Sequence, residues 1–267
     1  MKILLLANKD LASNLALNTL FQTLTGAHRF QILLSSTVGK NSKSKPQSLL
    51  DLAFFEQDLF NKILFPALQE TPTLKADKFQ SFAGFKTRGI DVSDIHSINC
   101  DAGIKRVNEF APDLIISIRF GLILQSAVIA IPKFGVINLH SGELPTYRGV
   151  MATFRAMQQN DTECGTTVHY INNSGIDNGE IISISKQALD YQRSYLHNTI
   201  SLYKTGIRDV VDAISKIEKS GKCGSYSADS QGNYFSFPCE QELEDFKQKG
   251  FKLYEYRDII DIAKSYY

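Results

Sequence analysis

Two polar side chains close an otherwise apolar strand near the middle of the chain. Residues 135–140 read Gly-Val-Ile-Asn-Leu-His and lead into a loop, which predicts a short buried strand. Asn138 and His140 are two positions apart, so both point to one face of that strand. An amide can hold an oxygen that gains negative charge, and an imidazole can move a proton near neutral pH. We therefore expect proton-transfer chemistry at the end of this strand.

Asp177 is the third candidate. It lies in the turn-rich loop 172–179, which reads Asn-Asn-Ser-Gly-Ile-Asp-Asn-Gly. A carboxylate at this place could orient a histidine and stabilise its charged form. The sequence does not establish that Asp177 reaches His140, and a turn residue without chemistry is the alternative interpretation.

An α/β scaffold is predicted to hold these side chains. Apolar runs and alternating segments predict strands at residues 2–7, 30–34, 113–118, 135–140, 164–171 and 181–186. Helical spacing is found at residues 17–24 (with Ser13 or Asn14 as the cap), 49–64, 150–157 and 196–217. The β-α-β opening implies a right-handed crossover and a Rossmann-like, mostly parallel sheet. Ligands bind beyond the carboxyl ends of the strands in such sheets.

The chain changes character after Gly221. Beyond it we expect a β-hairpin and two short helices, at residues 222–238, 240–249 and 256–264. The expected organisation is a catalytic core over residues 1–190, followed over residues 191–267 by the long helix, the hairpin and a C-terminal appendage.

Composition excludes several classes of protein. The 267 residues are 43% hydrophobic and 21% charged, which suits a buried core. With 29 Lys and Arg against 28 Asp and Glu, the net charge of +1 gives no global attraction for nucleic acid. The basic stretch 39–48 is expected to be a solvated loop. No apolar run reaches the roughly 18 residues of a membrane span, and the first residues lack the pattern of a signal peptide.

Four scattered cysteines argue against metal binding. They form no Cys-x-x-Cys pair and stand at Cys100, Cys164, Cys223 and Cys239. We expect reduced thiols, a cytoplasmic location and no bound metal.

Further motifs extend the pattern around Asn138 and His140. They are followed by Leu144-Pro145-x-Tyr147-Arg148-Gly149 and, later, by Asp177-x-Gly179. This series resembles the folate-dependent formyltransferases, and within them the bacterial nucleotide-sugar N-formyltransferases. The resemblance covers residues 1–190 and implies a Rossmann-like core. It also implies an Asn-His-Asp constellation that passes a formyl group from 10-formyltetrahydrofolate to an amine.

The resemblance implies a role for each matching residue. Asn138, His140 and Asp177 would be catalytic. Folate would lie against Phe120, Gly121, Leu122, Ile123, Gly175 and Ile176, and the acceptor would meet Lys9, Glu143, Tyr147 and Arg148. A structural arginine that bridges loops is an equal alternative for Arg148. Arg119 follows a buried strand and could contact folate or phosphate, or equally be a surface arginine paired with a carboxylate or a helix. The remaining histidines, His169 among them, are expected to be structural.

Departures from the family pattern narrow the choice of the molecule that accepts the formyl group. Ser-Gly-Glu follows His140 where the tRNA enzymes usually have Pro-Ser-Leu, and residues 8–15 lack the phosphate-cradling glycines of the ribonucleotide enzyme. The residues after 190 are few and near neutral, which argues against tRNA. The resemblance therefore implies a nucleotide-linked deoxyamino sugar, most of all a dTDP-amino sugar, used in surface polysaccharide such as lipopolysaccharide O-antigen.

Two other acceptors of the formyl group and a second copy of the chain as a partner are also considered. The amine could instead belong to methionyl-tRNA or a ribonucleotide, or water could replace it in a formyl-folate hydrolase. We expect a homodimer, because the aromatic residues of the predicted hairpin need a surface to cover them.

Overall fold

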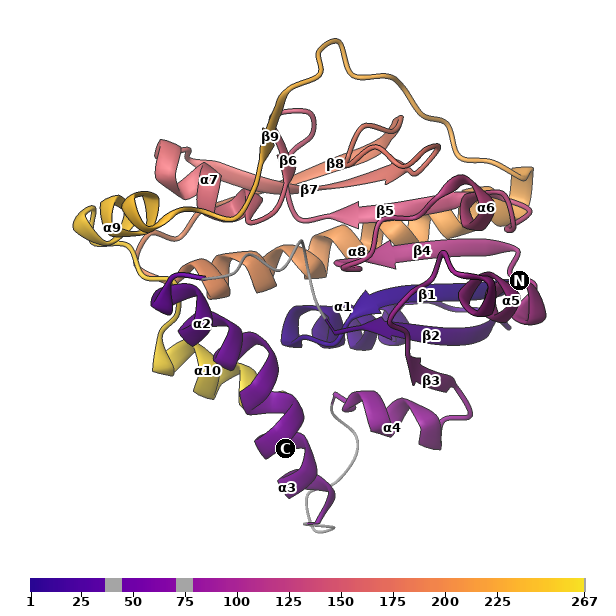
Figure 1. The fold of residues 1–267 in the computed structure, drawn as a ribbon, viewed down its shortest axis with the longest axis horizontal. Helices are drawn as coiled ribbons and strands as arrows, with labels where there is room; N and C mark the ends of the chain where they lie inside the picture. Colours follow the sequence, from indigo (N-terminus) through magenta and orange to yellow (C-terminus); the bar gives the residue numbers. More distant parts are fainter. Residues whose placement is uncertain (37–44, 71–78, 267) are drawn as a thin grey trace.

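A seven-stranded sheet forms the centre of the protein in the computed structural model, which describes residues 1–36, 45–70 and 79–266 (Figure 1). Its order is β3-β2-β1-β4-β5-β7-β8. These strands are β1 (Lys2–Asn8), β2 (Arg29–Ser35), β3 (Asp91–Asp94), β4 (Leu114–Ile118), β5 (Val136–His140), β7 (Glu163–Tyr170) and β8 (Ile181–Ala188). Neighbours from β3 to β5 run parallel, whereas β7 is antiparallel to both β5 and β8. The predicted α/β fold with a mostly parallel sheet is confirmed.

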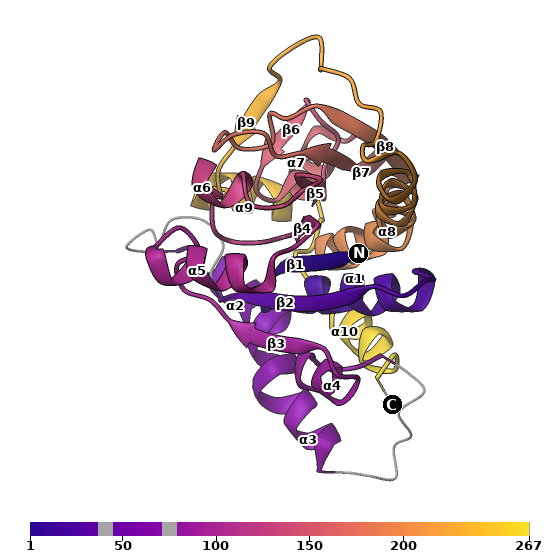
Figure 2. The same ribbon diagram turned by 90° about the vertical axis from the view of Figure 1, so that its right-hand side faces the viewer.

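Helices cover both faces of this sheet (Figure 2). On one face, α1 (Leu11–Thr23) and α8 (Tyr195–Ser220) pack against Ile3 and Leu5. On the other, α5 (Asp101–Phe110) and α6 (Ser126–Ile129) pack against Leu4 and Leu6. Alternate side chains of β1 thus enter two different cores, which explains its continuous apolar sequence. The division of the chain at residue 190 stays a prediction.

The first helix begins earlier than predicted. Asp10 is its cap and accepts a hydrogen bond from the Ser13 amide at 2.8 Å, so the expected caps, Ser13 and Asn14, lie inside the helix. A carboxylate directly before the first helical residue is well placed to accept hydrogen bonds from the free amides of the first turn. The positive end of α1 is therefore already neutralised by a side chain of the protein.

A helical arm extends from the sheet (Figure 1). It is continuous through α2 (Gln47–Ala53), the π-helix η1 (Phe54–Leu64) and α3 (Phe65–Gln69). It continues past Pro66, which is the second residue of α3. Residues 39–44 of the predicted basic loop lie outside the described residues. A further short helix, α4 (Phe82–Thr87), precedes β3.

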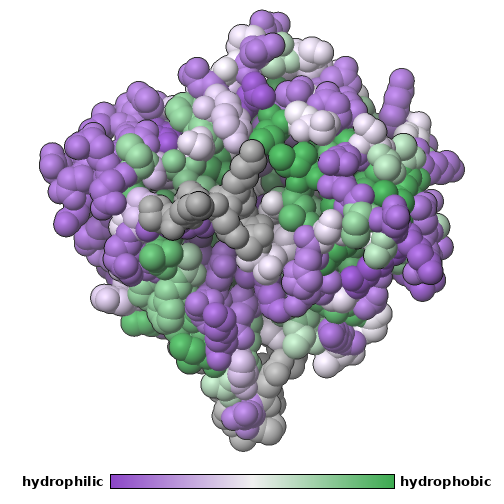
Figure 3. All heavy atoms as spheres, viewed as in Figure 1, coloured by the Kyte–Doolittle hydropathy of each residue, from purple (hydrophilic) through white to green (hydrophobic). Residues whose placement is uncertain are grey.

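The arm packs against α10 (Tyr256–Ala263) in a second apolar core. Large side chains also remain exposed on the arm and on α10, namely Leu50, Phe54, Ile63, Tyr256 and Ile260. Figure 3 shows hydrophobic surface over this corner of the molecule. None of the helices in the described ranges combines the length and the apolar character needed to cross a membrane.

The hairpin predicted over residues 222–238 does not form. Near its start, Tyr226 exchanges two backbone hydrogen bonds with Ile181, at 2.8 and 2.9 Å. Near its end, β9 (Asn233–Phe235) pairs in parallel with β6 (Tyr147–Gly149). The two halves therefore pair with separate parts of the core and not with each other. The helices α7 (Ala152–Gln159) and α9 (Glu240–Gln248) follow β6 and β9.

Candidate active site

Asn138 and His140 lie at the carboxyl end of β5, in the interior of the sheet. The antiparallel register sets Asn138 opposite His169 of β7, and His140 opposite Thr167. Directly opposed residues of two strands share a face of the sheet, as do residues two apart on one strand. The strand pairing therefore gathers Asn138, His140 and His169 on one face.

Asp177 joins this group from the loop between β7 and β8. Its Oδ2 lies 3.5 Å from His140 Nδ1, and its Oδ1 lies 3.4 Å from His169 Nε2. The Gly149 amide donates to Oδ2 at 2.9 Å. Only 10% of the side chain is exposed. Burial by itself would raise the pKa of Asp177, but the two imidazoles and this amide outweigh it and hold the pKa well below its usual range.

The hydrogen bonds of His140 fix its tautomer. Nε2 lies 2.7 Å from the Tyr147 carbonyl oxygen, which can only accept, so Nε2 carries a proton. In the neutral ring the lone pair is then on Nδ1, the nitrogen that faces Asp177. A proton that arrives at Nδ1 places its positive charge beside a buried carboxylate. This arrangement suits a base whose charged form must be stabilised.

His169 belongs to the same group, although the sequence led us to expect a structural histidine. Its Nδ1 donates to its neighbour's carbonyl, Tyr170 O, at 2.9 Å, so its Nε2 accepts from the Asn138 amide nitrogen at 3.0 Å. This bond fixes which end of the Asn138 amide is the donor. The signal that could have found His169 is its place on the alternating strand 164–171, beside the strand of Asn138.

The residues expected to contact folate surround the end of β4 and the Asp177 loop. The Gly121 amide donates to Ser35 Oγ at 2.9 Å, and the Ile123 carbonyl accepts from Asn99 at 2.8 Å. Phe120 and Leu122 pack against the apolar core beneath, and the Ile123 side chain is exposed. In the Asp177 loop, Gly175 accepts no side chain without displacing Asn178, and Ile176 offers its carbonyl to Arg148. Their contacts with folate stay predictions.

The four residues expected to meet the acceptor all have partners within the protein. Lys9 pairs with Asp94 at 3.1 Å, and Glu143 pairs with Lys186 at 2.8 Å. The Tyr147 hydroxyl donates to Asp161 at 2.6 Å, and burial and this carboxylate raise the Tyr147 pKa. The Arg148 guanidinium donates to the carbonyls of Ile176 and Gln231. Arg148 thus bridges loops, as one of the two sequence interpretations held, and the substrate roles stay predictions.

Arg119 stands in a buried cluster of charges beside the site. It follows β4 with a left-handed backbone (φ 57°) and contacts Asp10 at 3.0 Å and Glu56 at 3.6 Å. Burial raises the pKa of Glu56 to about 7, although Arg119 lowers it, and Asp10 adds to the increase. This geometry supports the ion-paired alternative for Arg119.

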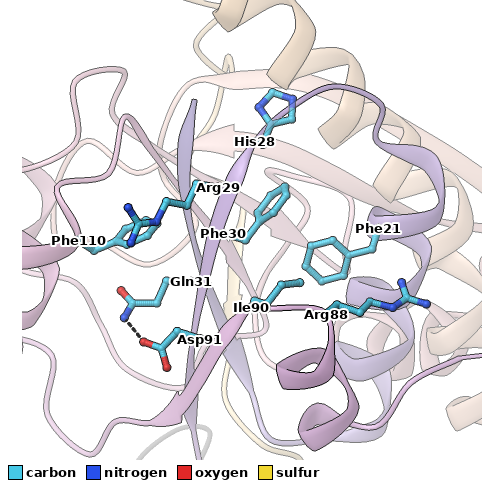
Figure 4. A pocket seen from close by; sticks show the side chains of 10 residues that line it. Phe21, His28, Arg29, Phe30, Gln31, Arg88, Ile90, Asp91 and Phe110 are labelled. Atoms are coloured by element: carbon cyan, nitrogen blue, oxygen red, sulfur yellow. Dashed lines mark hydrogen bonds between the residues drawn. The ribbon is translucent and has the colours of Figure 1, made fainter.

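A separate cavity of about 480 Å³ lies at the opposite end of the strands, where β2 and β3 begin (Figure 4). Phe21, Phe30 and Arg88 are among its lining residues, and no residue assigned a role from the sequence is. In the described part of the chain, no three histidine, cysteine, aspartate or glutamate side chains are grouped as a metal site requires.

Comparison with known proteins supports the importance of this region. Residues 94–195, which contain Asn138, His140 and Asp177, match the model of the formyl transferase family. Methionyl-tRNA formyltransferase of Ralstonia pickettii (strain 12J) is 32% identical over 123 residues, or 45% of this chain and 37% of that protein. The enzyme of the same name from Stenotrophomonas maltophilia (strain R551-3) is 36% identical over 95 residues, or 36% and 31%. The matched segments thus span well under half of these relatives.

Solved structures share the fold over more of the chain. WlaRD, a sugar 3N-formyl transferase determined with dTDP and 5-N-formyl-THF, has a TM-score of 0.57 and 17% identity, over 89% of this chain and 70% of that one. An N-formyltransferase from Helicobacter canadensis, with folinic acid and dTDP-3-aminofucose, has a TM-score of 0.53 and 17% identity, over 91% and 72%. The segment that carries Asn138, His140 and Asp177 is therefore similar to the formyl transferase family.

Proposed function

We propose that the protein transfers a formyl group from 10-formyltetrahydrofolate to the amino group of a nucleotide-linked deoxyamino sugar. One observation carries the proposal: Asn138, His140 and Asp177 meet at the carboxyl end of β5, inside the segment that matches the family. A folate that binds here would supply the formyl carbon as the electrophile. The side chains present fit that group, because an amide donor and an imidazole lone pair share one face of a strand end.

Asn138 acts on the formyl oxygen, which gains negative charge as an amine attacks the formyl carbon. An amide nitrogen carries two hydrogens, and His169 accepts one of them. The other is left to hold the oxygen. Because Asn138 is held in advance by His169, this donor needs little reorganisation when the charge develops, and such preorganisation is what makes a donor of this kind effective.

His140 removes the proton that the attacking amine must lose. Its Nε2 keeps a proton that it donates in a hydrogen bond to the Tyr147 carbonyl, so the proton from the amine is taken at Nδ1, beside Asp177. Asp177 keeps its negative charge throughout, because its pKa lies well below its usual range. It therefore stabilises the imidazolium that forms and does not itself become protonated. The bond between the formyl carbon and N10 of the folate would then break, and N10 would leave as tetrahydrofolate with the proton that His140 returns.

The proposed class of acceptor rests on the charge of residues 191–267 and on solved structures with a similar fold. Residues 191–267 hold eleven Lys and Arg against eleven Asp and Glu, so they carry no net positive charge to attract the phosphates of tRNA. Asp10 occupies the positive end of α1, where a phosphate could otherwise bind. Sugar N-formyltransferases determined with dTDP or a dTDP-sugar share the fold. We propose a dTDP-linked amino sugar of surface polysaccharide, such as lipopolysaccharide O-antigen, as the acceptor.

Methionyl-tRNA is the second candidate acceptor. The observation that favours it is the sequence identity of 32% with a methionyl-tRNA formyltransferase over 123 residues. A cytoplasmic location and a homodimer also stay predictions. The dimer was expected because a hairpin needed a surface to cover its aromatic residues, and this hairpin does not form. Sedimentation velocity at micromolar concentration measures the oligomeric state directly.

The experiment is an acceptor panel read by mass spectrometry. The protein is incubated with 10-formyltetrahydrofolate and, separately, with dTDP-amino sugars, UDP-amino sugars, glycinamide ribonucleotide and methionyl-tRNA. We expect one formyl group to appear on a dTDP-amino sugar, and to appear about 100- to 10,000-fold more slowly with the His140→Ala variant. Faster formylation of methionyl-tRNA would favour the second candidate. Loss of formyl-folate without any acceptor would show a hydrolase.

A further inference from the structure

The segment that links α8 to α9, residues 221–239, is called the strap here. It arches over β7 and β8 before it returns as β9 (Figure 1). Within it, Tyr226 is bonded to Ile181 at the start of β8, and β9 is paired with β6. The strap therefore joins the start of β8, where the Asp177 loop ends, to the segment that follows His140.

Three consecutive residues of β6 hold the catalytic side chains. The Tyr147 carbonyl oxygen accepts a hydrogen bond from His140 Nε2 at 2.7 Å. The Arg148 guanidinium donates through Nε and Nη2 to the Ile176 carbonyl, at 3.1 and 2.8 Å. The Gly149 amide donates to Asp177 Oδ2 at 2.9 Å. One short strand thus fixes the ring of His140 together with the carboxylate and adjoining backbone of Asp177.

Within the described sheets β6 has a single partner strand, and that partner belongs to the strap. The remaining guanidinium nitrogen of Arg148, Nη1, donates to the Gln231 carbonyl in the strap at 2.8 Å. Arg148 therefore connects the strap to the Asp177 loop within one side chain. A planar guanidinium can serve both carbonyls at once, which the single ammonium of lysine on a flexible stem cannot do with the same geometry.

Glycines allow the close approach of these backbones. Gly149 has φ 95°, and a Cβ there would lie 2.2 Å from the Phe235 carbonyl oxygen. Gly232 has φ 60°, and its Cβ would lie 1.6 Å from the Pro145 carbonyl oxygen. Real Cβ atoms do not approach so closely, so a side chain at Gly232 must push the strap away from the segment that follows His140. Asp177 itself has φ 48°, a conformation that a non-glycine residue keeps only when its surroundings enforce it.

We propose that Arg148 is a positioning residue, through which the strap sets the contact between Asp177 and His140. This rests on the proposed function and assigns Arg148 to the protein's own loops in place of a substrate phosphate. Asp177 Oδ2 and His140 Nδ1 lie 3.5 Å apart, which is near the upper limit for a hydrogen bond. A small shift of residues 176–177 therefore decides whether the two side chains interact. The strap is also distant in sequence from every residue that does chemistry, which makes it a separable element.

Kinetics separate positioning from substrate binding. Arg148→Met is expected to lower kcat by roughly 10–100-fold, because misplacement by about 1 Å costs up to about 100-fold, while KM for donor and acceptor stays within about twofold. Arg148→Lys keeps the charge and should not restore kcat. A large rise in KM for the nucleotide sugar with kcat intact, or full rescue by lysine, would overturn the proposal.

The strap variants test the coupling. Gly232→Ala is expected to lower kcat in the same way, and the double variant with Arg148→Met should lose less than the product of the two single effects. Gly224→Ala is the matched control, because a Cβ there meets no atom within 4 Å. Strictly multiplicative effects would show that the strap and Arg148 act separately, and a Gly224→Ala defect equal to that of Gly232→Ala would show nonspecific damage to the strap.

A readout that needs no turnover completes the test. The histidine ring nitrogens are observed by isotope-edited NMR in the folded, ligand-free protein, with His140 assigned through His140→Gln. We expect the His140 signals, but not those of exposed His96, to move in both Arg148→Met and Gly232→Ala, and to stay in place in Gly224→Ala. This result holds whichever amine is the acceptor. Unchanged His140 signals in both folded variants would refute the positioning role even if the proposed function were correct.

Discussion

The charge of Asp177 is the feature whose removal tests the candidate site most severely. Asp177→Asn keeps the shape of the side chain and an oxygen for the Gly149 amide, but it removes the negative charge 3.5 Å from His140 Nδ1. At that separation and an effective dielectric constant of about 20, the attraction between two unit charges is about 5 kcal/mol. Part of it is replaced by the amide dipole, so we expect a loss of about 3–4 kcal/mol, or roughly 100- to 1,000-fold in kcat.

The assay is single-turnover formyl transfer at saturating donor and acceptor, so that product release does not mask the chemical step. Asp245→Asn, on the exposed face of α9, is the control for the same substitution away from the site. The stability of the wild type relative to Asp177→Asn should also depend on pH. The lowered pKa of Asp177 stabilises the folded state at neutral pH, and this contribution disappears as pH falls below about 4. A folded Asp177→Asn variant with wild-type kcat would refute the reasoning.

Three further predictions follow from the contacts. Asn138→Ala should lower kcat by about 100- to 1,000-fold with little change in KM, because its amide acts on charge that develops only during the reaction; a raised KM with intact kcat would instead indicate ground-state binding. His169→Phe keeps a ring but removes the partner of Asn138, and should lower kcat by roughly 10–100-fold, as expected for about 1–3 kcal/mol of hydrogen bonding. The raised pKa of Glu56, about 7 against 4.5, makes its contribution to folding favourable in acid and lost as pH rises through 7. Denaturation should therefore show wild type losing stability relative to Glu56→Gln between pH 5 and 8, by up to about 3 kcal/mol, and a constant difference would contradict this.

The sequence predicted six of the seven strands of the central sheet, all except β3, because these six carry strong local signals. β1, β4 and β5 are buried on both faces, so each is a continuous apolar run whose burial does not depend on distant detail. The end of β5 could also be recognised as the candidate site, since Asn138 and His140 share a face by simple alternation. Asp177 was found by its motif, whereas its contact with His140 depends on how the chain folds back.

Long-range pairing explains what the sequence did not predict. Residues 222–238 have the composition of a hairpin, but β9 finds its partner in β6, some 85 positions earlier in the chain. A segment of three residues has no periodicity that could reveal such a choice. His169 was misjudged for the same reason, because its importance comes from the strand register opposite Asn138 and not from its neighbours in sequence.

Transfer of an isotopically labelled formyl group tests the central claim most directly. Labelled 10-formyltetrahydrofolate is mixed with a dTDP-amino sugar and either wild-type protein or His140→Ala, and the product amide is followed in a single turnover. We expect the label to appear on the sugar nitrogen with wild type, and to appear about 100- to 10,000-fold more slowly with His140→Ala, the usual range for loss of a general base. Transfer at the same rate by both proteins, each correctly folded, would contradict the assignment of the site.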